Sequence, residues 1–145
     1  MNGKLFAIVI MGLALAGCIG VQVPAPSAVE KGKAIFNDPK LGTTGGSCNT
    51  CHPNGGTIGG KVGDMPIPDL HGAAPTFPKF KSWANKTITL AEMNNACITM
   101  MLKGKPLDVQ SQEMKDLEAY LHSLKGTPVT PAPAAAKPAP KAPGY

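Results

Sequence analysis

The chain has 145 residues, enough for one domain of ordinary size with extended ends. Its formal net charge of +5 comes entirely from lysine, because the sequence contains no arginine. Proteins that bind nucleic acids usually use arginine to contact phosphates and base edges, so the composition argues against a nucleic-acid partner.

Residues 1–17 have the order of an export signal: a lysine, an apolar run too short to span a bilayer, and small residues. The segment Leu15-Ala16-Gly17-Cys18 resembles the lipobox of bacterial lipoproteins, which implies cleavage before Cys18 and a lipid on its sulfur. Ordinary cleavage after Ala16 is the alternative. We expect a periplasmic protein, attached to a membrane only through a lipid on Cys18.

The rest of the chain divides by composition. Residues 18–26 form a short Pro-containing tether. Residues 127–145 contain six prolines and six alanines, a composition that cannot bury a core and predicts a disordered tail. We therefore expect residues 27–126 to form a single domain.

Three helices are predicted in this domain. The first opens with the capping box Ser27–Glu30 and ends before Pro39. The second opens with the capping box Thr89–Glu92 and runs to about residue 102, and the third occupies about residues 111–125, with apolar side chains at helical spacing.

Residues 42–78 are rich in glycine and proline and show no sustained period, so they are predicted to be loop. No alternating pattern indicates a strand. The predicted fold class is therefore all-α with long loops. A loop of this length in a compact domain needs something other than secondary structure to fill the core.

The segment Cys48-Asn49-Thr50-Cys51-His52 gathers two thiols and an imidazole. A zinc site would need four ligands, with His71 or Cys97 as the fourth, and the adjacent Cys51 and His52 side chains diverge. A redox disulfide of the thioredoxin type expects a βαβ setting, which the pattern lacks. Covalent haem attachment fits best: two thiols three residues apart add to the vinyl groups, and the next residue places an imidazole under the iron. One such motif predicts one haem c.

With this motif in place, residues 28–125 resemble the class I c-type cytochromes. Gly32 and Phe36 match the positions where that family's N-terminal helix meets its C-terminal helix, here Leu117, Tyr120 and Leu121. The segment Pro68-Asp69-Leu70-His71-Gly72 is similar to a family segment in which the proline carbonyl accepts a hydrogen bond from the proximal imidazole and the leucine packs on the haem. The resemblance implies that Pro68 orients His52 and that Leu70 contacts the haem.

Residues 77–124 also resemble the N-terminal haem domain of thiosulfate dehydrogenases and related sulfur-oxidising cytochromes. In those proteins the cysteine of an asparagine-x-cysteine motif ligates the iron, and it matches Cys97. An arginine three residues later in those proteins corresponds to Met100 here.

The sixth iron ligand is predicted among Met100, Met101 and Cys97. The class I resemblance implies a methionine in this part of the chain, and a thioether raises the haem potential. Met100 and Met101 project about 100° apart on a helix, so only one of them can face the iron. Met100 shares an apolar face with Cys97, which makes Met100 the predicted ligand and Cys97 a buried small hydrophobe.

The expected function is one-electron transfer between periplasmic redox protein partners, without catalysis, through a haem held by His52 and Met100. An alternative is a sulfur-compound (thiosulfate-type) oxidoreductase haem domain that uses Cys97. A second alternative is a ligand-sensing haem protein. Lys79, Lys81 and Lys86 are candidates for a basic rim at the haem edge, to which a partner docks.

Overall fold

The computed structural model describes residues 24–126, so the predicted signal, Cys18 and the predicted tail lie outside the described residues. The described chain contains five α-helices: α1 (Ala28–Asn37), α2 (Cys48–Cys51), α3 (Pro53–Gly56), α4 (Leu90–Met100) and α5 (Gln112–Ser123). Two 3₁₀ turns, η1 (Ala74–Thr76) and η2 (Ser82–Ala84), complete the helical elements of this part of the chain. Within residues 24–126, no helix combines the length and the apolar character needed to cross a membrane.

The three long helices lie where the sequence predicts them. The hydroxyl of Ser27 accepts from the Glu30 N–H at 3.3 Å, while the Glu30 carboxylate accepts from the Ser27 N–H at 2.8 Å, so the first capping box is formed. The same reciprocal pair joins Thr89 and Glu92 at the start of α4. Each box satisfies amide groups that an uncapped helix would leave free.

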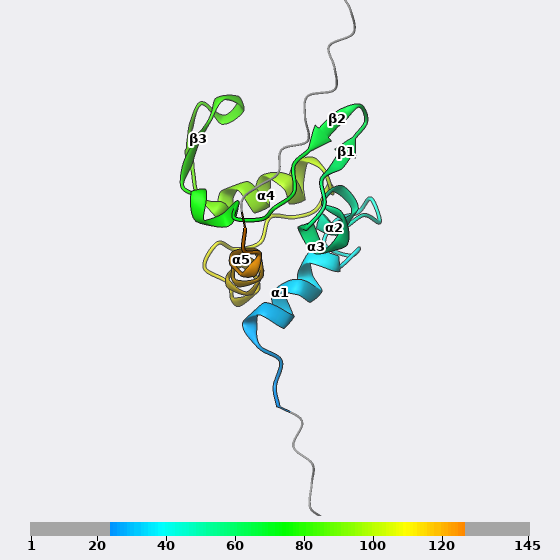
Figure 1. The fold of residues 1–145 in the computed structure, drawn as a ribbon, viewed down its shortest axis with the longest axis vertical. Coiled ribbons are helices and arrows are strands. Elements are labelled where there is room, and N and C mark those ends of the chain that lie inside the picture. The colour runs from blue at the N-terminus through cyan, green and yellow to red at the C-terminus, as the bar shows by residue number, and fades with distance from the viewer. Residues whose placement is uncertain (1–23, 127–145) are drawn as a thin grey trace, which may run out of the picture.

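Helices α1 and α5 pack closely against each other, as the family resemblance implies (Figure 1). Gly32 allows this approach because a Cβ at that position would overlap the main-chain carbonyl of Asp116. The rings of Phe36 and Tyr120 lie 5.3 Å apart in a tilted arrangement. Tyr120 also donates its hydroxyl to the carbonyl of Gly55 at 2.8 Å, which fastens α5 to the segment that follows the cysteine motif.

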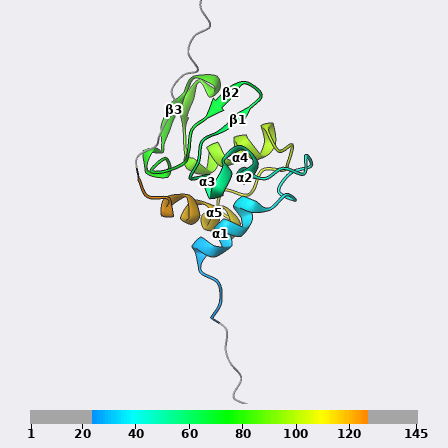
Figure 2. The ribbon, with the colours of Figure 1, turned by 45° about the vertical axis from the view of Figure 1, so that its right-hand side comes forward.

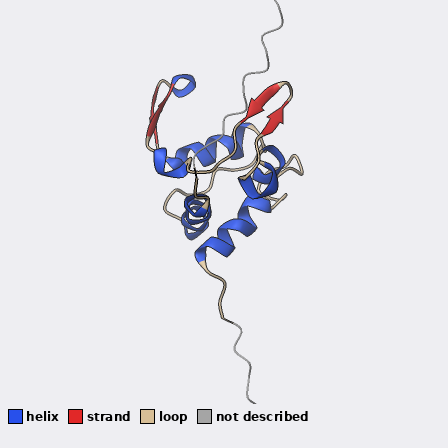
Figure 3. Ribbon diagram, viewed as in Figure 1, coloured by secondary structure: helices blue, strands red, loops and turns tan. Residues whose placement is uncertain are grey.

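The prediction of an all-α fold without strands is only partly right. Strands β1 (Gly60–Val62) and β2 (Met65–Ile67) form one antiparallel hairpin, and β3 (Lys79–Lys81) and β4 (Lys86–Ile88) form another (Figure 3). Each strand is three residues long, too short to give a recognisable alternation, and each is stabilised by its pairing partner. The predicted loop 42–78 therefore contains α2, α3 and the first hairpin.

Both hairpins project to the same side of α4 (Figures 1 and 2). The position of α4 is fixed at its middle by Asn95, whose side-chain amide donates to the Leu107 carbonyl and accepts from the Leu107 N–H, each at 2.8 Å. These two bonds hold the chain that leaves α4 against the helix. Residues of both hairpins, α2 and α4 line one cavity.

Candidate functional site

A cavity of about 600 Å³ lies between α2, α4 and the two hairpins, a size within the range of cofactor sites. Its lining is mostly apolar and includes residues of α5 and of both hairpins. Every residue that the sequence predicts at the site lines this one cavity: Cys48, Cys51, His52, Pro68, Leu70, Cys97, Met100 and Met101.

The cysteine motif forms a single helical turn, α2, that places its thiols on the cavity wall. Thr50 closes the turn by accepting from the Ser47 N–H at 2.9 Å, and the His52 N–H donates to the Cys48 carbonyl at 2.9 Å. Burial, together with the nearby Cys97 and Cys51 thiols, raises the pKa of the Cys48 thiol to about 12. Without haem, Cys48 is therefore a neutral thiol at physiological pH.

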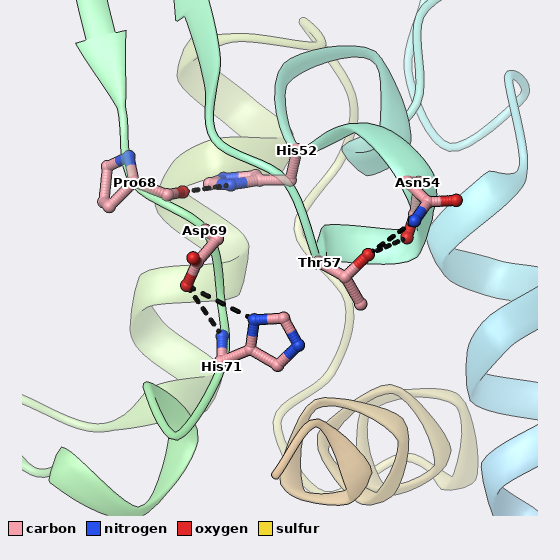
Figure 4. A network of polar contacts seen from close by, with 6 residues as sticks. All are labelled: His52, Asn54, Thr57, Pro68, Asp69 and His71. Carbon is pink, nitrogen blue, oxygen red and sulfur yellow. Dashed lines mark hydrogen bonds and ion pairs between the residues drawn. The ribbon is translucent and has the colours of Figure 1, made fainter. Parts of the chain in front are cut away.

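The imidazole of His52 is oriented by Pro68, whose carbonyl oxygen lies 3.2 Å from Nδ1 (Figure 4). A carbonyl oxygen can only accept, so Nδ1 carries the proton and Nε2 keeps its lone pair. Burial lowers the pKa of His52, which favours the neutral ring, while the bond to Pro68 opposes this shift. The predicted contact is therefore present, and it prepares Nε2 to bind a metal.

The segment that carries Pro68 is itself fixed by hydrogen bonds. Asp69 is buried, and its Oδ1 accepts from the His71 N–H at 3.2 Å and lies 3.6 Å from the ring Nδ1 of His71 (Figure 4). The Leu70 N–H donates to the Gly56 carbonyl at 2.8 Å, which ties the segment to α3. His71 is not part of the cavity lining and contacts Asp69 instead.

The zinc alternative finds no support in the described part of the chain. Between residues 24 and 126, no three His, Cys, Asp or Glu side chains converge closely enough to hold a metal ion. His71 pairs with Asp69 instead of approaching Cys51 or His52. Cys48, Cys51 and Cys97 are all free thiols.

Four sulfur-bearing side chains reach the cavity from α4 and the residue that caps it: Met93, Cys97, Met100 and Met101. Met100 is 56% exposed and Met101 is 39% exposed, whereas Cys97 is half-buried. Burial raises the pKa of the Cys97 thiol, Cys51 raises it further, and the positive charge of Lys81 lowers it. Cys97 thus shares the cavity with the cysteine motif and with Lys81. The choice of Met100 as the sixth ligand stays a prediction.

The model of the SoxA/TsdA cytochrome c domain family matches residues 31–129. The chain belongs to this family. A curated relative, the L-cysteine S-thiosulfotransferase subunit SoxA of Rhodovulum sulfidophilum, is 30% identical over 103 residues, which are 70% of this chain and 32% of the relative. A chain in the crystal structure of SoxXA from P. pantotrophus aligns with a TM-score of 0.50 and 23% identity, over 65% of this chain and 31% of that chain.

The structural similarity to the SoxXA chain shows that this chain and that one share a fold. This chain spans about a third of the length of both relatives. The comparisons support the thiosulfate-related alternative better than the predicted simple electron carrier.

A SoxA/TsdA cytochrome c domain carries covalently bound haem c, as predicted. The cavity of this domain fits that group: two thiols lie on one wall, and the imidazole beside them has Nε2 free to ligate. Leu70 and Leu121 contribute to the apolar lining. The fit therefore rests on the donor set as well as on the volume.

Sequence reasoning missed the part that the hairpins play in this SoxA/TsdA domain. Val62, Met65 and Ile67 of the first hairpin line the cavity, as do Lys79 and Lys81 of the second. The lysines were predicted only as a docking rim. The order Lys-Phe-Lys puts both lysines on one face once β3 is known to be a strand, but three residues are too few to indicate a strand from the sequence.

Proposed function

We propose that this domain is a haem domain of a sulfur-compound oxidoreductase of the thiosulfate type, in which Cys97 would act within the cavity that His52 also lines. The observation that supports this most directly is the position of Cys97. Cys97 lines the same cavity as Cys48, Cys51 and His52, and it is less exposed than Met100 or Met101. The relative from Rhodovulum sulfidophilum, a subunit of an L-cysteine S-thiosulfotransferase, points to the same chemistry.

The haem-binding roles follow from the cavity walls. Cys48 and Cys51 would form the two thioether bonds, and His52 would be the proximal ligand through Nε2. Pro68 keeps the His52 ring in one tautomer and orientation, and Leu70, which lines the cavity, would pack against the cofactor. Haem c supplies a centre that accepts and donates one electron at a time.

The protein contributes binding, orientation and exclusion of water. Cys97 presents a soft sulfur that would ligate the iron or react with a sulfur compound, and the apolar walls keep bulk water away from it. Electrons would pass on to periplasmic redox proteins, in keeping with the predicted export signal and the predicted lipid on Cys18.

The ferric haem spectrum tests the proposal. Cys97→Ser should change the ligand-field spectrum and electron paramagnetic resonance signals of the oxidised protein and abolish its turnover with thiosulfate. Met100→Ala should leave both the spectrum and the turnover intact. The reverse pattern, with a methionine–iron charge-transfer band lost in Met100→Ala and no thiosulfate turnover in the wild type, would support the simple electron carrier instead.

A further inference from the structure

Two lysines of β3 face the inside of the cavity. Lys79 and Lys81 line it, whereas Phe80 between them is 62% exposed on the opposite face of the strand. This follows from the two-residue period of a strand. The hairpin therefore places its charges inward and its aromatic residue outward, the reverse of the arrangement expected for a strand that covers an apolar core.

The two ammonium groups are held near one aromatic ring. Nζ of Lys79 lies 4.4 Å from the centroid of the Phe77 ring, and Nζ of Lys81 lies 5.8 Å from it, distances suited to cation–π contact. Lys79 also donates to the hydroxyl of Thr76 at 3.0 Å. These contacts keep both charges at the wall of the cavity.

In the described part of the chain, no carboxylate forms an ion pair with Lys79 or Lys81. The ion pairs within residues 24–126 are His71–Asp69 and Lys86–Glu92, and neither includes these lysines. Burial and the neighbouring Lys81 both lower the pKa of Lys79, as expected for two like charges in a partly desolvated place. Two cations at a mostly apolar wall cost free energy, which an anion between them would offset.

Lys81 and Cys97 line the same cavity. An anion held by Lys81 would therefore share that cavity with the Cys97 sulfur. A lysine offers three rotatable donors, which suit the spread oxygen atoms of an oxoanion.

We propose that Lys79 and Lys81 bind a small sulfur oxoanion with two negative charges, of the thiosulfate class, inside the cavity beside Cys97. This inference rests on the proposed function and names the residues that hold its substrate. The two positive charges match the two negative charges of the anion. The haem carboxylates offer the same anionic oxygen atoms, so the experiment must separate the two sources.

The test is calorimetric titration of the haem-loaded ferric protein with thiosulfate and with sulfate, at constant ionic strength. Sulfate has the same charge but is not oxidised, so it reports binding without turnover. The double variant Lys79→Gln/Lys81→Gln should bind both anions at least about tenfold more weakly, as expected from the loss of two partly exposed charge contacts. Lys81→Arg, which keeps the charge, should retain most of the affinity.

Lys86→Gln is the matched control. Lys86 is the register partner of Lys81 across the hairpin, but its Nζ pairs with Glu92 at 2.8 Å and it does not line this cavity. Removal of its charge should change neither affinity by more than about twofold. Each variant is checked for an unchanged Soret band and helix content. If the double variant does not fold, the single variant Lys81→Gln is measured.

Equal affinity in the double variant and the wild type would overturn the inference, as would a wild type that binds neither anion. Unchanged anion affinity together with a shifted haem midpoint potential would also overturn it, because the lysines would then pair with the haem carboxylates. Lysine-dependent binding in a protein that does not oxidise thiosulfate would support the inference and contradict the proposed function. Thiosulfate turnover with an unchanged KM in the double variant would contradict the inference and support the proposed function.

Discussion

The imidazole Nδ1 of His52 and the carbonyl oxygen of Pro68 lie 3.2 Å apart, although 16 positions separate the two residues in the chain. The contact decides which ring nitrogen carries the proton, and therefore which one is left to bind iron. It depends on the fixed course of the segment around Pro68, which Leu70 and Asp69 anchor through their own hydrogen bonds.

The spectral change caused by loss of the proximal imidazole should be reversed by adding free imidazole. His52→Gly is expected to lose the low-spin ferric spectrum while haem stays attached through Cys48 and Cys51, and millimolar imidazole should restore the spectrum. His71→Ala is the matched control, since His71 pairs with Asp69 outside the cavity lining and its loss should leave the spectrum unchanged. An unaltered spectrum in His52→Gly would show that another group is the proximal ligand.

The contact between the first and last helices should tolerate no added methyl group at Gly32. A Cβ there would overlap the Asp116 carbonyl and approach Tyr120, so Gly32→Ala should lower the free energy of unfolding by about 1–3 kcal/mol. Urea denaturation followed by circular dichroism measures the change. Lys33→Ala, on the exposed side of the same helix, should be nearly neutral.

The Asn95 side chain should contribute more to the free energy of unfolding than the side chain of its neighbour Asn94. Asn95→Ala removes both bonds to the Leu107 backbone and leaves a half-buried N–H and C=O without them, a loss of about 1–3 kcal/mol in the free energy of unfolding. Asn94 makes one weak contact to the Met114 sulfur at 3.7 Å, so Asn94→Ala should cost less. Equal destabilisation of the two variants in urea would contradict this account of how α4 is held.

The capping carboxylates of Glu30 and Glu92 should make the stability of the fold decrease at acid pH. Ser27 lowers the pKa of Glu30, and Lys86 followed by Thr89 lowers the pKa of Glu92, both from an ordinary value of 4.5. A lowered folded pKa gives stability that is fully present above pH 4.5 and is lost as the pH falls through the folded value. Thermal melts from pH 7 to pH 3 should therefore show a shallower acid decline for Glu92→Gln than for the wild type. An acid decline in Glu92→Gln as steep as that of the wild type would contradict this account.

The long helices and the cysteine motif could be predicted because their signals are local. The boxes Ser27–Glu30 and Thr89–Glu92 carry both partners of each contact within four residues, and the motif places its thiols and imidazole in one turn. The Pro68 contact was predictable only through a family resemblance, since nothing local pairs it with His52.

The hairpins and the inward lysines could not be predicted in the same way. A strand of three residues such as β3 shows at most one alternation, and its face is set by its partner strand and by the cavity. The choice among Cys97, Met100 and Met101 is equally non-local. It depends on the rotation of α4, which the Asn95–Leu107 contact sets from outside the helix.

The hydroxyl of Tyr120 gives the last helix a second attachment besides α1. Since Tyr120 bonds to Gly55 and its ring packs on Phe36, any opening of α5 must break the helix pair and release the segment after the cysteine motif together. Slow amide hydrogen exchange should therefore report one cooperative unit made of α1, α5 and the residues around Gly55. Between residues 24 and 126 no hydrogen bond joins either hairpin to α5, so the hairpin amides are expected to exchange outside this unit.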